Sequence, residues 1–299
     1  LVSETMSKEK RGYGTMIIVT FGALGAVVAS FVGSEGAVIG DFINSLVGVQ
    51  LDNWQVTYIV GGCLGLFLLL LRVGTIESSY FENMDQNQNI QKGNLKILFY
   101  NKKNFIKYVH CIVIGIPIWY VVGLLVMNSK DNFAPLMGIH DIENGQAVMY
   151  TYIGLSVGDL ISGILSQWLR SRKKVVGLYL GFTLVLITSF LFFMEGASKD
   201  TYYLLCFLLG TATGYWALFV SIAAEQFGTN IRSTTANTIP NFVRGSVNLI
   251  MLGFGLLTAL NLGDAISAYI VGLVFILLAL YSLSQLKETF GKDLDYFET

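Results

Sequence analysis

The stretch AEQFGTNIR, at residues 224–232, lies between two long apolar segments. It begins as a loop and leads into a segment that is long enough to span a membrane. Glu225 and Arg232 form an E-x6-R pair at the predicted membrane face, and Arg244 follows inside the spanning segment. We expect this combination, a loop motif followed by a deeply placed arginine, to determine the function of the chain.

The composition indicates a membrane protein. Of the 299 residues, 54% are hydrophobic and only 13% are charged, and the mean hydropathy is +0.61. A soluble domain carries roughly 25% charged residues. Apolar runs recur along the chain, each long enough to cross about 30 Å of hydrocarbon at about 1.5 Å per residue. We therefore predict an all-α membrane protein, and the net charge of −1 argues against a nucleic-acid partner.

Eight apolar segments are separated by polar loops. In the third of them Pro117 lies near the middle and predicts a kink. Residues 94–104 mix aliphatic and aromatic residues with lysines, which is typical of an interfacial segment. The predicted spans are 13–33, 54–73, 105–127, 148–169, 175–194, 201–224, 234–260 and 265–286.

The positive charges are distributed very unevenly among the loops. Of the 19 lysines and arginines, only Lys130 and Lys199 fall on the loops of one side, and Arg244 is intramembrane. All the others lie on the opposite side or at span ends next to it. Because cytoplasmic loops carry an excess of Lys and Arg, this pattern predicts that both termini are cytoplasmic.

An internal repeat connects the two ends of the chain. An E-x6-R pattern at residues 4–11 precedes the first span, and the same pattern at 225–232 precedes the seventh. The sequence ESSYFE at 77–82 follows the second span, and ETFGKDLD at 288–295 follows the eighth. Two parallel repeats of this kind are typical of transporters whose halves are related by an axis along the membrane normal.

These motifs resemble those of the major facilitator superfamily, nearest its sugar-porter and organic-ion branches. That family carries E-x6-R between its helices 4 and 5 and between its helices 10 and 11. Its sixth and twelfth helices end in motifs similar to IESS at 76–79 and KETFGK at 287–292. The loop after the fourth span is similar to the basic gating motif of the family. The resemblance implies gate roles at the cytoplasmic face for Glu4, Arg11, Glu225, Arg232, Gly163, Gln167 (in place of an aspartate of the motif) and Arg172.

The resemblance also implies a domain organisation. The eight spans match helices 5 to 12 of a twelve-helix major facilitator bundle, so we expect the chain to be a fragment, with a native eight-span protein as the alternative. Residues 1–73 would be a remnant of the N-terminal half with two spans, 74–104 a cytoplasmic linker, and 105–299 the six-helix C-terminal half. The expected location is a bacterial cytoplasmic membrane.

Two ionisable residues, Asp159 and Arg244, lie deep in predicted spans. A lone charge at the bilayer centre costs at least about 2.5 kcal/mol, so each needs a polar cavity or a partner. Asn237, Asn241, Arg244 and Asn248 are spaced to share one helix face. One hypothesis is a cavity wall on which Arg244 binds an anionic group of the substrate by paired hydrogen bonds, as the resemblance to organic-ion carriers implies. The alternative is a structural Asp159–Arg244 ion pair.

Four aromatic residues, Trp119, Tyr120, Tyr215 and Trp216, are candidate substrate contacts, although membrane aromatics often only pack. Asp159 is the candidate for ion coupling, with protons or Na+ as the coupled ion. An enzyme is not expected. An intramembrane aspartyl protease needs a second membrane aspartate, and the sequence contains neither H-E-x-x-H nor G-x-S-x-G. No C-x2-C pair suggests a metal site, and no cofactor is expected.

The sequence therefore predicts a secondary active transporter of a small polar solute in a lipid bilayer. The substrate is expected to bind at the midplane between two halves that alternate in access. Arg244 favours a small organic anion. A sugar or another polyol is the second candidate, and a non-transporting membrane receptor with a transporter fold is the third.

Overall fold

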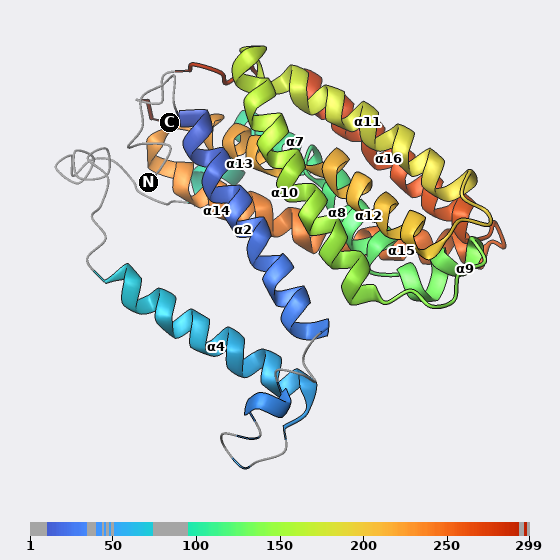
Figure 1. Cartoon of the computed structure of the whole chain (residues 1–299). Helices are drawn as coiled ribbons and strands as arrows, with labels where there is room; N and C mark the ends of the chain where they lie inside the picture. Colours follow the sequence, from blue (N-terminus) through green and yellow to red (C-terminus); the bar gives the residue numbers. More distant parts are fainter. Residues whose placement is uncertain are drawn as a thin grey trace.

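The computed structural model describes residues 11–34, 40–43, 45, 48, 51–73, 95–292 and 296–297. These residues form an all-α bundle without strands (Figure 1). Eight helical segments in the described part are long and apolar enough to span a membrane. The predicted fold class and the predicted number of spans are confirmed.

The first two spanning helices differ in their surroundings. Helix α2 (Arg11–Ser34) packs along α10, whereas α4 (Asn53–Arg72) lies apart from the bundle (Figure 1). Along α4 the side chains from Leu64 to Leu71 are exposed. Exposed apolar side chains are suited to contact with lipid chains or with other membrane helices, because both surroundings are apolar and contact with them has no desolvation cost.

Six further spans form the compact part of the bundle, and three of them are interrupted helices. Their elements, in chain order, are α7 (Lys102–Val113), α8 (Ile116–Trp119) and η1 (Tyr120–Val126), then α10 (Asn144–Trp168), α11 (Arg172–Phe192), α12 (Lys199–Thr213) with α13 (Trp216–Glu225), α14 (Thr229–Gly245) with α15 (Val247–Ala259), and α16 (Asp264–Gln285). Short helices α6 (Leu95–Tyr100), η2 (Ser129–Phe133) and α9 (Ala134–Leu136) lie between them.

Pro117 explains the first interruption. It occupies the first turn of α8, where a proline is tolerated because its missing N–H would have no intrahelical partner. The preceding helix α7 ends at Val113, and the following turn is a π-helix. The predicted kink is confirmed, as a break rather than a gentle bend.

Helix caps explain where several spans begin. Side chains of Asn101, Ser171 and Ser198 accept hydrogen bonds from backbone N–H groups in the first turns of α7, α11 and α12. Each satisfies a donor that has no partner inside its own helix. Ser171 follows Arg170, which has a positive φ of 48°, so the basic connection between α10 and α11 is a very tight turn.

Close backbone contact joins α10 to α12. A Cβ atom added to Gly158 would meet the backbone of Thr211 and Gly214, and one added to Gly210 would meet the backbone of Thr151. Both helices carry the small-xxx-small spacing that permits such an approach, at Gly154 and Gly158 and at Gly210 and Gly214. The two helices therefore pack in direct backbone contact.

Several boundaries differ from the sequence prediction by a few residues, and two of these differences change the placement of residues named above. Helix α14 begins at Thr229 instead of 234, because Gly228, the last of the three residues that connect it to α13, adopts the extended conformation of an N-cap residue. Arg232 is therefore in the first helical turn and not in a loop. Helix α7 begins at Lys102 instead of 105, so the predicted interfacial segment is itself largely helical.

Candidate functional site

A cavity of about 480 Å³ lies between α2 and the compact part of the bundle. Its α2 wall consists of small and aliphatic side chains, among them Ile18 and Gly22. The opposite wall carries the larger and more polar groups. These come from α8, α10, α13 and α14 and are Trp119, Tyr152, Trp216 and Arg244. A volume in the range of about 300–1,000 Å³ with few polar groups is typical of small-molecule sites.

Arg244 is the charged group of this cavity. It lies at the midpoint of the 31-residue span Thr229–Ala259, as its predicted depth requires. Its Nη1 donates to Asn241 Oδ1 at 3.1 Å, and its guanidinium carbon lies 5.3 Å from the centroid of the Trp216 ring. Arg244 is exposed, and among the described residues no carboxylate pairs with it, so most of its five donors are available to a ligand.

The asparagines of the same helix face have different surroundings. The amide groups of Asn237 and Asn241 donate to backbone carbonyls of α14, each at 2.9 Å. Asn248 lies in the first turn of α15 and donates to the carbonyl of Gly245, in α14, at 3.4 Å. Only Asn241 contacts Arg244. Asn241 also lines a neighbouring hollow of about 500 Å³ on the other side of α14. Asn237 and Asn248 are exposed but do not line the Arg244 cavity.

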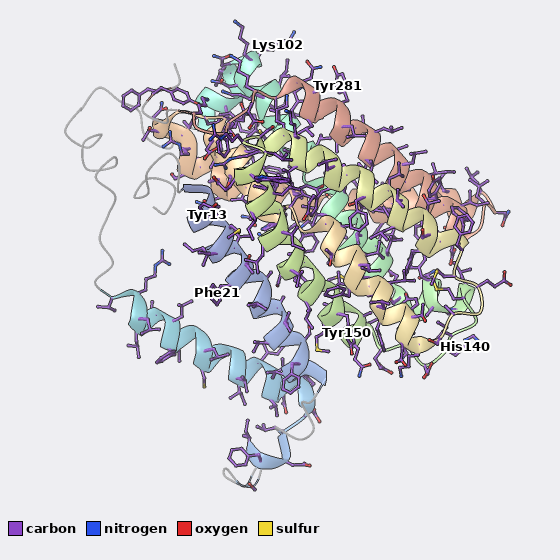
Figure 2. All side chains as sticks on the ribbon, turned by 45° about the horizontal axis from the view of Figure 1, so that its top comes forward. Tyr13, Phe21, Lys102, His140, Tyr150 and Tyr281 are labelled. Carbon is purple, nitrogen blue, oxygen red and sulfur yellow. The ribbon has the colours of Figure 1, made fainter. Side chains whose placement is uncertain are left out.

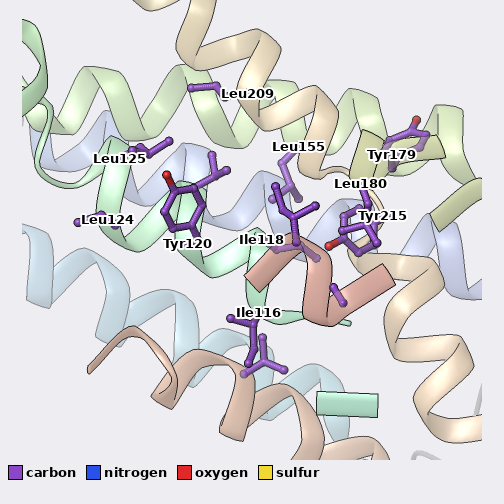
Figure 3. Packing of buried hydrophobic residues seen from close by; sticks show 14 of the residues in the cluster. Ile116, Ile118, Tyr120, Leu124, Leu125, Leu155, Tyr179, Leu180, Leu209 and Tyr215 are labelled. Atoms are coloured by element: carbon purple, nitrogen blue, oxygen red, sulfur yellow. The ribbon is translucent and has the colours of Figure 1, made fainter. Parts of the chain in front are cut away.

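The four candidate aromatics separate into two pairs. Trp119 and Trp216 line the cavity. Tyr120 and Tyr215 are fully buried, and their hydroxyls donate to the carbonyls of Ala268 at 2.7 Å and Ile114 at 3.1 Å. Figure 3 shows both tyrosines inside the apolar packing of the bundle. Tyr120 thus joins the third span to α16, and Tyr215 joins two interrupted spans; neither lines the cavity.

The carboxylate of Asp159 binds the N-terminus of α13 and does not pair with Arg244. The side chain is fully buried, and its Oδ1 accepts a hydrogen bond from the backbone N–H of Ala217 at 3.0 Å. It thereby caps the start of α13, where the chain resumes after the break at Gly214. Its Oδ2 has no hydrogen-bond partner among the described residues. The Asp159–Arg244 ion pair that the sequence left open is not formed.

A buried ion pair holds one end of the bundle together. Arg172 Nη2 lies 2.9 Å from Glu225 Oε1, and both side chains are almost completely buried. The pair joins the first residue of α11 to the last residue of α13. Removing one partner of such a pair leaves a buried charge uncompensated, which costs several kcal/mol.

Glu288 binds the same end of α11. Its carboxylate accepts hydrogen bonds from the Ser171 hydroxyl and from the backbone N–H groups of Arg172 and Lys173, the latter two at 3.1 and 3.2 Å. Burial disfavours the charged carboxylate, but these bonds and one from the N–H of Phe290 outweigh it and lower the pKa of Glu288 below its ordinary value. The carboxylate also faces the positive end of the α11 dipole.

Gly163 and Gln167, two other predicted gate residues, lie at the contact between α2 and α10. A Cβ atom on Gly163 would meet Met16, and one on Gly12 would meet the amide of Gln167. Arg232 is buried in the first turn of α14 and donates to Thr229 Oγ1 at 3.2 Å. Glu4 and the side chain of Arg11 lie outside the described residues.

Sequence reasoning missed two contributors to these sites. Tyr152 lines the cavity together with Leu155, but the sequence does not say which face of their helix turns towards α2. Glu288 appeared in the sequence analysis only as part of the C-terminal tail motif. That motif does not predict that Glu288 caps the N-terminus of α11. As for metals, the described residues contain no cluster of three or more histidine, cysteine, aspartate or glutamate side chains.

Two comparisons bear on the identity of this site. A family model described as Major Facilitator Superfamily matches residues 1–251. The matched region contains the cavity, Arg244 and the whole α2–α10 contact. No curated protein was found to match the chain.

Proposed function

The chain belongs to the Major Facilitator Superfamily, and on this basis we propose that it transports a small organic anion by alternating access. Members of this family carry small solutes across lipid bilayers, and the chain is an integral membrane protein with apolar spanning helices. The proposed affinity for an organic anion corresponds to the organic-ion branch of the family, with the sugar-porter branch as the alternative.

The observation that carries the proposal is the environment of Arg244. Its guanidinium donates to Asn241 and lies near the Trp216 ring, and it borders the cavity at the midpoint of its spanning segment. A planar guanidinium binds a carboxylate through two parallel hydrogen bonds. The low dielectric of the membrane interior strengthens such a pair, and it makes an unpaired guanidinium costly.

The position of the cavity supports alternating access. It lies between α2, assigned to the N-terminal portion (residues 1–73), and helices of the proposed C-terminal half (105–299). Residues 74–104 would link the two. The contacts of Gly163 and Gln167 with α2, together with Arg172, Glu225 and Arg232, would close the site from the cytoplasmic side of a bacterial inner membrane, where we place both termini.

Asp159 is the proposed coupling residue. Its carboxylate is buried, caps α13 through Oδ1 and leaves Oδ2 without a partner among the described residues. Protonation would remove the charge that favours the capping bond. Because α13 also carries Trp216, protonation would be transmitted to the Arg244 cavity, which suits symport with protons more directly than with Na+.

The test compares binding and uptake of panels of small carboxylates and neutral polyols. Arg244→Ala should weaken binding of the preferred carboxylate at least about 30-fold, since truncating one partner of a buried charge pair costs roughly 2–5 kcal/mol. Arg244→Lys should also weaken it markedly, because lysine offers a point charge. Asn248→Ala is the matched control, because Asn248 lies in α15 of the same spanning segment but does not line the cavity, and it should leave binding unchanged.

Three outcomes would contradict the proposal in different ways. Recovery of binding in the double variant Asp159→Asn/Arg244→Gln would mean that Arg244 serves only to neutralise Asp159. Tight binding of a polyol that is indifferent to Arg244 would favour the sugar alternative. Binding of a carboxylate without its accumulation by cells would favour the receptor alternative.

A further inference from the structure

One residue of the α2 wall, Gly22, adds no side chain to the Arg244 cavity. Figure 2 shows α2, on which Tyr13 and Phe21 are labelled, beside α10, which carries Tyr150. Gly22 lines the cavity, and a Cβ atom added to it would meet no atom within 4 Å. Its neighbour Phe21 is 69% exposed and does not line the cavity. The backbone of α2 therefore borders the cavity directly at Gly22.

Packing between helices does not account for this glycine. On α10, a Cβ atom at Gly163 would meet Met16 of α2, so the missing side chain there lets the neighbouring helix approach. At Gly22 the missing side chain accommodates no other helix, although glycine stabilises a helix less than alanine does. The space that it leaves belongs to the cavity, where a ligand can occupy it.

The polar side chains of the cavity lie opposite α2 and are mainly hydrogen-bond donors. Arg244 and the indole N–H groups of Trp119 and Trp216 only donate. The hydroxyl of Tyr152 both donates and accepts, and no carboxylate or amide side chain is among the described lining residues. A polyol would bring several hydroxyl donors to a single acceptor, so most of them would remain unpaired. The cavity therefore favours a ligand that presents acceptor oxygens to Arg244.

The rest of the cavity wall is apolar. Its apolar lining residues, apart from the glycine and the two tryptophans, are Ile18, Val19, Ala23, Ala26, Ile118, Val122 and Leu155. A second charged group of a ligand would lie against these side chains without a partner, which is unfavourable. An apolar body would instead be removed from water there, with a gain that grows with the area buried. The lining thus favours one anionic group on an otherwise apolar ligand.

We propose that the ligand is a monocarboxylate with a bulky apolar body, and that Gly22 sets the largest body that the cavity accepts. This inference rests on the proposed function, since it places the carboxylate on Arg244. From there the body extends between the tryptophans and α2, through the cavity of about 480 Å³. A side chain at position 22 would compete with it for the same space. Gly22 therefore contacts the apolar body and leaves the carboxylate untouched.

The test measures binding of butyrate, benzoate and naphthoate to the full chain in detergent by isothermal titration calorimetry. These monocarboxylates share a head group and differ in their apolar bodies, so the affinity of the wild type should rise along the series. Gly22→Leu should weaken naphthoate binding at least about tenfold and change butyrate binding less than about twofold, because an apolar pocket discriminates by size. Gly22→Ala should produce a smaller loss in the same order.

Gly25→Leu is the matched control. It makes the same change at an exposed glycine of α2 that does not line the cavity, and there too a Cβ atom would meet no atom within 4 Å. It should leave all three affinities unchanged, and thermal unfolding of each variant checks that the fold is retained. Equal losses in Gly22→Leu and Gly25→Leu, or an equal loss of all three ligands in Gly22→Leu, would overturn the role of Gly22.

Two further measurements separate this inference from the proposed function. Succinate, which adds a second carboxylate to butyrate, should bind more weakly than butyrate, and tighter binding would overturn the monocarboxylate. If Arg244→Ala weakens benzoate binding while Gly22→Leu shows no selection by size, the proposed function stands and this inference is wrong. If Arg244→Ala leaves benzoate binding unchanged, the proposed function is wrong and the inference that rests on it is wrong as well.

Discussion

The two deep charges of this protein have separate partners. Arg244 is oriented by a neutral amide and an aromatic ring, so its charge remains available at the cavity. Asp159 is enclosed among helices and bound to a helix N-terminus. A mutual ion pair would have neutralised both, whereas this arrangement leaves each without an ion-pair partner among the described residues, as the proposed anion site and the proposed coupling residue require.

Glu288 gives a prediction at the same scale. Glu288→Gln should lower the thermal stability of the purified protein at pH 7, because an anionic acceptor at the start of α11 becomes neutral; loss of a cap costs about 1 kcal/mol. Since the folded-state pKa of Glu288 is lowered, its contribution is complete above the ordinary pKa of 4.5 and is lost as pH falls through the folded value.

The measurement is the difference in unfolding temperature between wild type and Glu288→Gln over a pH series. The difference should be constant near neutral pH and should shrink below about pH 4.5. Glu143→Gln serves as a control, because Glu143 is an exposed carboxylate that pairs with the exposed Lys130 at 3.2 Å. A difference that persists unchanged into acid would show that the charge of Glu288 is not what stabilises the helix.

At the scale of elements, interrupted helices define the site. Helix α13 begins just after the break at Gly214. The backbone N–H groups of its first turn therefore lie inside the bundle, where water cannot bind them. Asp159 of α10 supplies the acceptor. The same break places Trp216 at the cavity and the Tyr215 hydroxyl on the carbonyl of Ile114, at the α7–α8 break.

Substitutions of Asp159 separate its capping role from its coupling role. Asp159→Ala removes the acceptor and should destabilise the protein by about 0.5–2 kcal/mol. Asp159→Asn keeps an acceptor oxygen, so the fold and anion binding should survive while the proton dependence of uptake is lost. Uptake measured at several external pH values checks this. Proton-dependent uptake by Asp159→Asn would remove Asp159 from the coupling mechanism.

The contact between α10 and α12 gives a prediction about packing. Gly158→Ala would place a methyl group against the backbone of Thr211 and Gly214. Backbone cannot move aside cheaply, so the unfolding temperature should fall, at a cost of about 1–3 kcal/mol for overpacking. Gly181→Ala on α11 is the control, because a Cβ atom there meets no atom within 4 Å. Equal stability of the two variants would contradict direct backbone contact between α10 and α12.

At the scale of the whole molecule, alternating access requires the α2–α10 contact to separate during each cycle. A Cβ atom on Gly163 would lie 3.0 Å from that of Met16, slightly closer than the 3.5–4.5 Å of a disulfide. In a Cys63→Ser background, which removes the exposed native cysteine, Met16→Cys/Gly163→Cys should cross-link on mild oxidation. Transport should then stop and return on reduction, while anion binding persists.

Single-cysteine variants treated with the same oxidant are the controls for this experiment. They should transport at the same rate before and after oxidation. Full transport by the cross-linked protein would mean that α2 and α10 move as one unit, and the boundary between the moving halves would have to lie elsewhere. The native Cys111 and Cys206 are buried and do not interfere.

The sequence alone determined the eight spans and the depth of Arg244. Both depend on local quantities, the length and hydropathy of a segment and the distance of a residue from its ends, which do not involve other helices. The repeat of E-x6-R and the tail motifs indicated the family for the same reason, because a motif is read along the chain.

Only the tertiary structure decided which groups meet. Helical periodicity places Asn241 and Arg244 on one face, but it does not say what that face turns towards. Periodicity could not show that Asp159 caps α13 or that Glu225 pairs with Arg172. It also could not show that Tyr215 is buried while its neighbour Trp216 lines the cavity. Those partnerships depend on the rotation of each helix and on breaks within it, which are set by close packing between segments far apart in the sequence.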